Sequence, residues 1–340
     1  MTAPNIGLVL GGGGIAGYAF HAAVLAAIED RTGFDPRNAA VVVGTSAGSI
    51  ACAVVRGNVA AADLRERLVN IRDNPRELAD LKLLAGRSPQ VIPRFWAGPG
   101  SPGLAVRELR QGRNLRLGPL VGGLLPAGRL TLGPIRQPLV ALHEERWPDR
   151  PLWIPATDLA TGERVVFGRD ERPAVADAVT ASSSLPGFFA PTRIGTRRYI
   201  DGGMASPFNA ELLQDYRTTD DRPLDLVLVL APLSIDEIRR AQPLASAIRS
   251  YPRHQLKREV RQLRDRGTTV VVIQPDRGVT RAMGLNPMDP NRVRAIIGRS
   301  ERMVDRRVVV LDPAVRAVLD EAAKLPSPTD VPYPQPPDHN

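Results

Sequence analysis

The stretch Val41-Val42-Val43-Gly44-Thr45-Ser46-Ala47-Gly48 joins a short apolar run to a run of small residues, Ser49 to Val54. An apolar run followed by G-x-S-x-G and then by small residues predicts a strand that enters a helix through a nucleophile elbow. Such a turn is so tight that glycine is required at its flanking positions, here Gly44 and Gly48. It would lift the Ser46 hydroxyl clear of the sheet at the N-terminus of the helix.

Outward from this elbow, buried strands alternate with helices along the chain. Ile6 to Leu10 and Leu226 to Leu230 are continuous aliphatic runs, typical of strands that are covered on both faces. Between and beyond them we expect strands at 41–43, 152–157, 165–167, 199–200 and 269–274, and helices at 17–29, 291–303 and 314–324. The fold class expected is a three-layer α/β/α sandwich with a mostly parallel central sheet.

Length and composition set further limits on this chain. Its 340 residues, 43% of them apolar, can form one large domain, which we place at 1–325. The Pro-rich, polar stretch 326–340 predicts a disordered tail. The single cysteine, Cys52, excludes an internal disulfide framework. No stretch is long enough to span a membrane, and the N-terminus has no charged signal region, so we expect a cytoplasmic protein.

The net charge of +9 is concentrated in one segment, residues 82–136. Nine basic residues and one acidic residue, Glu108, fall within it, among many Gly and Pro and with no sustained helical period. We interpret the segment as an insertion that could act as a lid or bind an anionic membrane surface transiently. The alternative is a solvated insertion whose arginines pair with acids elsewhere. The pattern does not suggest a nucleic acid partner.

A glycine loop follows the first strand: Gly11, Gly12, Gly13, Gly14 and, after Ile15-Ala16, Gly17. The spacing Gly12-x-Gly14-x-x-Gly17 also fits a dinucleotide fingerprint, but that site needs an acidic residue at the end of the second strand. The second strand ends in Gly44-Thr45-Ser46 instead. We therefore expect no nucleotide cofactor, and the loop can instead direct several backbone N–H groups at one point, as an oxyanion hole requires. We expect no other cofactor and no metal.

A serine nucleophile also needs a base. The four histidines are His21, His143, His254 and His339, and none has a neighbourhood of turn residues typical of a catalytic mount. Asp201 stands at the end of a predicted strand, followed by Gly202 and Gly203, which permit close backbone approach. An Asp-Gly pair is also an ordinary turn, so the residues alone leave the base open.

Taken in order, the motifs Gly12–Gly17, Gly44–Gly48 and Asp201-Gly202-Gly203 resemble those of the patatin-like phospholipases. The segments 156–163 and 181–191 are similar to stretches of bacterial members. The resemblance implies a Ser46–Asp201 dyad without a third member, an oxyanion hole at Gly12, Gly13 and Gly14, and hydrolysis of a phospholipid, lysophospholipid or other lipid ester through an acyl-serine. One position departs from the family pattern, because Ala16 stands where members usually carry Lys or Arg.

Two other functions remain open at this point. One is an α/β-hydrolase with a Ser–His–Asp triad, for example Ser46, Asp201 and His254, although that fold usually places its elbow after more strands. The other is a non-catalytic, lipid-binding member of the same fold, which the loss of the basic residue at Ala16 would favour.

Overall fold

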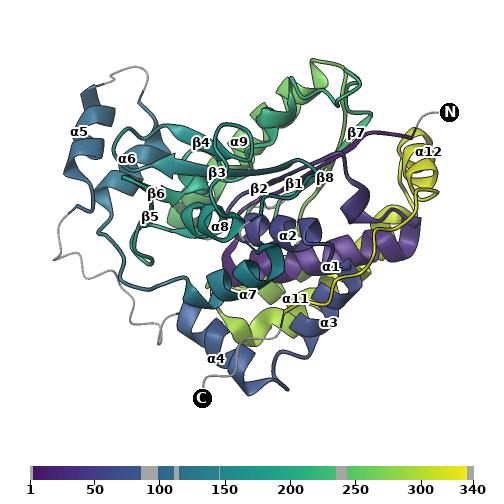
Figure 1. Cartoon of the computed structure of the whole chain (residues 1–340), viewed down its shortest axis with the longest axis horizontal. Helices are drawn as coiled ribbons and strands as arrows, with labels where there is room; N and C mark the ends of the chain where they lie inside the picture. Colours follow the sequence, from purple (N-terminus) through teal and green to yellow (C-terminus); the bar gives the residue numbers. More distant parts are fainter. Residues whose placement is uncertain (1–2, 86–98, 111–114, 145, 235–242, 335–340) are drawn as a thin grey trace.

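The computed structural model describes residues 3–85, 99–110, 115–144, 146–234 and 243–334 (Figure 1). Within them lies an eight-stranded sheet of order β5-β6-β3-β2-β1-β7-β8, with β4 paired to β3. The part from β3 to β8 is parallel, whereas β4, β6 and β5 add antiparallel pairs. The strands are β1 (Ile6–Leu10), β2 (Val41–Gly44), β3 (Leu152–Asp158), β4 (Arg164–Phe167), β5 (Thr192–Ile194), β6 (Arg197–Asp201), β7 (Leu226–Leu230) and β8 (Thr269–Ile273).

The central strand β1 is buried over its whole length, as its continuous aliphatic sequence predicts. Its side chains alternate between two separate hydrophobic clusters, because successive residues of a strand point to opposite faces. Leu8 and Leu10 belong to one cluster and Val9 to the other. Both faces of the sheet are therefore covered.

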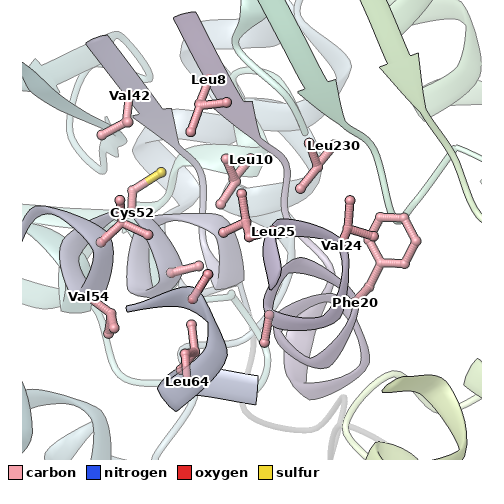
Figure 2. Close-up of a cluster of buried hydrophobic side chains, with 14 of the residues drawn as sticks. Leu8, Leu10, Phe20, Val24, Leu25, Val42, Cys52, Val54, Leu64 and Leu230 are labelled. Carbon is pink, nitrogen blue, oxygen red and sulfur yellow. The ribbon is translucent and has the colours of Figure 1, made fainter. Parts of the chain in front are cut away.

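Helices form a layer on each face. On one face α1 (Gly14–Thr32), α2 (Ala47–Arg56), α3 (Ala61–Val69) and α11 (Val293–Val308) form the larger layer. Figure 2 shows Leu8, Leu10 and Leu230 from the strands lying against Phe20, Leu25 and Cys52 from the helices. On the other face Leu213 of the short helix η5 (Ala210–Leu213) and Leu256 and Val260 of α9 (Pro243–Arg264) pack against β1, β2 and β7. The expected mostly parallel α/β sandwich is confirmed.

The remaining helices are α4 (Pro75–Leu84), α5 (Pro102–Arg110), α6 (Leu117–Leu124), α7 (Gly133–His143), α8 (Val175–Ser183), α10 (Arg277–Met283), α12 (Pro313–Ala322), η1 (Pro36–Asn38), η4 (Gly202–Met204) and η6 (Pro290–Arg292). Of these, α7, α8, α10 and α12 also contribute buried residues to the larger hydrophobic cluster. No helix in the described part of the chain is long and apolar enough to cross a membrane.

The basic segment 82–136 is more regular than its sequence predicts. Its described residues include all of α5 and α6, which pack against each other. Glycines of α6 make the close approaches: a Cβ on Gly123 would lie 2.8 Å from the Ala105 nitrogen of α5, and one on Gly118 would lie 1.9 Å from the Met204 oxygen of η4. Because the packing face of α6 carries glycines, its sequence lacks the helical periodicity of apolar residues that predicts a helix. Residues 86–98 and 111–114 of the segment lie outside the described residues.

The C-terminal stretch also differs from its expectation of disorder. Residues 326–334 have no regular secondary structure, but they are held along the helical layer by specific contacts. Asp330 pairs with the buried Arg37, and the Val331 N–H donates to the Asn58 carbonyl at 3.0 Å. Proline-rich composition does not indicate such anchoring contacts. Residues 335–340 lie outside the described residues.

Candidate active site

The nucleophile elbow has the strained geometry that its sequence predicts. Ser46 lies between β2 and α2 with φ 52° and ψ −121°, a backbone conformation that residues other than glycine adopt rarely. A Cβ on Gly48 would lie 1.9 Å from the Leu10 oxygen, and one on Gly44 would lie 2.6 Å from the Gly48 oxygen. Only glycine fits at these two positions, which is why the strand can turn so sharply into the helix.

Asp201 reaches the same place from a distant part of the chain. It ends β6, where it is paired with Ala156 of β3, and β3 in turn lies beside β2. The elbow leaves β2 just beyond the pair Val43–Trp153, close to the level of Ala156. The sheet register therefore brings Asp201 next to Ser46, and the Ser46 side chain favours the charged form of the Asp201 carboxyl.

The Asp201 carboxylate is buried, with 3% of the residue exposed. It accepts a hydrogen bond of 2.7 Å from the Gly203 N–H. Burial raises the pKa of Asp201 from 3.8 to about 6, although the bonds from Gly203 and from the Ser46 hydroxyl oppose this shift. Asp201 is thus a stronger base than an exposed aspartate, and it remains mostly ionised at neutral pH.

The glycine loop lies beside Ser46, since a Cβ on Gly12 would be 3.5 Å from the Ser46 Cβ. The Gly12 N–H, however, donates to the Pro207 carbonyl at 2.9 Å. The Gly13 and Gly14 N–H groups have no acceptor among the described residues, and Gly14 opens α1 with φ +60°. Of the three amides expected to form an oxyanion hole, Gly12 is therefore already engaged, and only Gly13 and Gly14 are free.

Helix α2 adds an amide that the sequence analysis did not name. Ala47 follows Ser46 as the first residue of α2, and its N–H has no acceptor among the described residues. In a nucleophile elbow the amide after the serine commonly faces the oxyanion. The sequence motif could have indicated the Ala47 amide, because in G-x-S-x-G the residue after the serine is the one whose N–H commonly faces the oxyanion.

A buried polar network supports the elbow from behind. Asn209 donates to the Thr45 hydroxyl at 2.9 Å and to the Ser206 carbonyl at 2.6 Å. Ser206 in turn donates to Glu259 of α9, and the second Glu259 oxygen accepts the Ala210 N–H at 2.7 Å. Burial and the nearby Glu211 carboxyl raise the pKa of Glu259. No motif in the sequence indicates these residues, because they come from separate segments.

The remaining glycines and Ala16 have packing roles. A Cβ on Gly13 would lie 2.8 Å from the Gly17 Cα, and one on Gly202 would lie 2.1 Å from the Pro155 oxygen. Ala16 is buried, with 3% exposed, and its N–H donates to the Pro287 carbonyl at 2.8 Å. The position usually held by a basic residue in the family is thus packed into the core here.

Ser46, Asp201 and the loop line a cavity of about 440 Å³ whose walls are mainly apolar. Its wall is built from helices α1, α3, α4 and α7 and from the segments around Phe188 and Met288. The apolar wall includes Ile50, Leu68, Leu81, Leu132, Phe189 and Met288. Such a space suits an apolar ligand group held beside the serine.

No histidine among the described residues lines this cavity. His21 is buried and its Nε2 lies 2.7 Å from the Gly11 carbonyl, whereas His143 bonds the Ala53 carbonyl at 2.9 Å. Burial lowers the pKa of His21 to about 4 and that of His143 below 6.5. His254 is exposed on α9, and His339 lies outside the described residues. The triad with His254 therefore has no geometric support.

The fold and this cavity define a class: an α/β sandwich whose second strand enters a helix through a nucleophile elbow, with a buried aspartate beside the serine. The sequence model of the patatin-like phospholipases matches residues 8–213. The chain belongs to the patatin-like phospholipase family. Its general function is accordingly that of a lipid acyl hydrolase.

Three solved structures are similar to the chain at low identity. The structure of VipD from Legionella pneumophila has 14% identity and a TM-score of 0.38, over 89% of this chain and 67% of that one. The type III effector protein ExoU has 12% identity and a TM-score of 0.36, over 95% and 54%. The heterodimeric ExoU-SpcU complex from the type III secretion system of Pseudomonas aeruginosa has 17% identity and a TM-score of 0.32, over 96% and 68%. The chain thus spans about half to two thirds of the length of these proteins.

Proposed function

We propose that the chain hydrolyses lipid esters with Ser46 as nucleophile and Asp201 as the only general base. The observation that carries the proposal is the buried Asp201 carboxylate, which lies beside Ser46 at the wall of an apolar cavity. Burial gives the carboxylate the proton affinity that a base needs. In a triad, the third residue orients the imidazole of the histidine. No histidine among the described residues lines this cavity, so the proposed site needs no third residue.

In the proposed cycle, Ser46 Oγ attacks the ester carbonyl carbon while Asp201 takes the hydroxyl proton. Asp201 then returns this proton to the departing alcohol, which leaves an acyl group on Ser46. A water molecule attacks the acyl-serine, Asp201 accepts its proton, and the fatty acid is released as Ser46 is reprotonated. One residue thus serves as base and acid in turn.

The tetrahedral oxyanion of each step needs hydrogen-bond donors. We assign this role to the Gly13 and Gly14 amides at the start of α1 and to the Ala47 amide at the start of α2. Their N–H groups are free in the described structure, whereas Gly12 would have to give up its bond to Pro207. The N-termini of two helices also favour negative charge at this point.

The apolar cavity supports an acyl chain as the group held beside Ser46. A phospholipid or lysophospholipid is the substrate class proposed first, with neutral acyl esters as the second. Neither a metal nor a cofactor is part of the proposed chemistry.

The deciding experiment combines covalent labelling with a lipid panel. We expect a fluorophosphonate to label the wild-type chain and the control Ser300→Ala, since Ser300 is buried in α11 and does not line the cavity. Ser46→Ala should lose labelling and all hydrolysis of phospholipid, lysophospholipid and neutral esters. Turnover at the wild-type rate in Asp201→Asn would refute the dyad. Absent labelling, with lipid binding retained, would favour the non-catalytic alternative.

The surface of α5 and α6 supports a second part of the proposal, a transient contact with an anionic membrane. Large apolar side chains are exposed there beside the basic Arg107 and Arg110. They are Val106, Leu109, Leu117, Val121 and Leu124, each between 46% and 60% exposed. Arg116 is different, because it pairs with the buried Glu108. Exposed apolar and basic side chains on these two neighbouring helices favour insertion at an anionic interface.

A further inference from the structure

The C-terminal segment 326–334 brings one aromatic side chain, Tyr333, to the cavity that contains Ser46. After α12 the chain turns back along the helical layer, where Figure 1 shows it running past α1 and α3 toward α4. Its course is marked by contacts to several elements: the Pro326 carbonyl accepts from Asn38, Asp330 pairs with Arg37, and the Pro334 carbonyl accepts from Arg67 at 3.3 Å. These anchors leave Tyr333 little freedom to move away from the wall.

Tyr333 is fixed on the side of the cavity that α3 and α4 form. Its ring lies under the Arg67 guanidinium, with 3.5 Å between the guanidinium carbon and the ring centroid. Tyr18 of α1 lies near it and influences its pKa. Arg67 and Tyr18 line the same cavity. Burial raises the pKa of both tyrosines, so both rings keep their protons at neutral pH.

The cation in this cluster has partners on two of its nitrogens and on one face. Arg67 Nε donates to Glu77 Oε2 at 2.8 Å, Nη1 donates to the Pro334 carbonyl, and the face of the guanidinium rests on Tyr333. Glu77 is also bonded to Asn74 at 2.9 Å. A group with these partners is poorly placed to bind a phosphate of the substrate. The cluster therefore suits a polar wall that stops an apolar chain rather than a site for the lipid head group.

We propose that Tyr333 is a specificity-determining residue, which closes the cavity on the α3–α4 side and limits the length of the acyl chain that Ser46 can accept. The inference rests on the proposed function and names the feature that selects its substrate. On this side of the cavity, which Leu68 and Leu81 also line, a longer chain would meet the ring of Tyr333 and the Arg67–Glu77 pair. Burying methylene groups against this ion pair would gain no hydrophobic free energy and would disturb its bonds.

The test compares Tyr333→Ala with Tyr333→Phe on p-nitrophenyl esters of increasing acyl length. Tyr333→Ala removes the ring, and we expect kcat/KM for long chains to rise by about tenfold relative to that for short chains. Tyr333→Phe keeps the ring and should keep the wild-type length profile. A profile unchanged in Tyr333→Ala, or an equal loss at every length, would overturn the proposal.

Binding measurements separate this inference from the proposed reaction. In a Ser46→Ala background, unlabelled fatty acids of graded length are used to displace a fluorescent fatty acid. The chain length that binds best then shows the effect of the Tyr333 wall without any hydrolysis. If the wild type hydrolyses no ester, the proposed function fails, while a shift toward longer fatty acids in Ser46→Ala/Tyr333→Ala would still support the wall. Should Tyr333→Ala not fold, Tyr333→Leu is expected to give a smaller shift in the same direction, and no shift in it counts against the proposal.

Discussion

At the scale of single residues, the pKa of Asp201 sets the pH dependence of the proposed reaction. Asp201 accepts a proton only as a carboxylate, and its pKa is about 6 rather than 3.8. We therefore expect kcat/KM for a soluble ester to rise with pH through a midpoint of about 6. Asp201→Asn should lower the rate by about 10²–10⁴-fold and remove this midpoint. A steady-state profile between pH 4.5 and 8 tests the expectation, and a midpoint retained in Asp201→Asn contradicts it.

His21 should set a different pH dependence, that of stability. Its pKa is about 4 in the folded chain and 6.5 in the ordinary state, so below pH 6.5 the unfolded chain binds more protons. The free energy of unfolding should fall as the pH drops from 6.5 toward 4, by up to about 3 kcal/mol from this residue. Above pH 6.5 the effect is absent.

His21→Gln isolates this contribution. A glutamine amide can donate to the Gly11 carbonyl in place of Nε2 but does not titrate. We expect the variant to lose less stability than the wild type between pH 6.5 and pH 4 in urea unfolding. Equal slopes in the two proteins would show that His21 does not titrate as its burial requires.

At the scale of elements, the elbow depends on the contact between α2 and β1. A methyl group on Gly48 would lie 1.9 Å from the Leu10 oxygen. Because this oxygen belongs to the backbone, the clash could be relieved only by moving the helix away from the strand. We expect Gly48→Ala to lower the free energy of unfolding by about 3 kcal/mol or more. The matched control is Gly103→Ala in α5, where a Cβ meets nothing within 4 Å and should be neutral or slightly stabilising. Chemical denaturation of both variants gives the comparison, and equal stabilities would contradict it.

The elements that the sequence predicts well are those whose burial is complete. Strands β1 and β7 have the predicted bounds, since a strand covered on both faces shows an unbroken aliphatic run. The helix predicted at 17–29 extends over Gly14–Thr32 in the structure, because the glycines at its start do not indicate the first turn of α1. Strand β5, of three residues at the sheet edge, gives no such signal. Helix α6 was missed because glycine, not an apolar side chain, makes its contacts.

The residues of the candidate site likewise fall into those that the sequence predicts and those that it does not. Ser46, Asp201 and the glycine loop stand in short motifs, because tight turns require glycine at fixed positions next to the reactive side chain. The engaged Gly12 amide, the Asn209–Ser206–Glu259 network and Tyr333 depend on contacts between segments far apart in sequence. One sequence alone does not indicate such contacts, because it does not distinguish these residues from others of the same type elsewhere in the chain.

At the scale of the whole molecule, the exposed residues of α5 and α6 are the part of the chain that we propose meets the membrane. Lipid esters are concentrated in membranes, and a hydrolase must reach them at an interface. Leu109 and Leu117 are 60% and 57% exposed, and Arg107 and Arg110 are exposed beside them. Burying an apolar side chain of this size gains about 1.5–3 kcal/mol, and each arginine near an anionic surface adds about 1 kcal/mol.

We therefore expect the double variant Leu109→Ser/Leu117→Ser to weaken binding to phosphatidylserine-containing vesicles by about tenfold or more, measured by flotation. Arg107→Gln/Arg110→Gln should weaken binding mainly at low salt, because screening already removes much of their contribution at high salt. Hydrolysis of a soluble ester should be unchanged in both variants, since none of the four residues lines the cavity. The control is Leu285→Ser, an equally large side chain, 77% exposed between α10 and α11. If that substitution weakens vesicle binding as much as the α5–α6 pair does, the membrane contact lies elsewhere on the molecule.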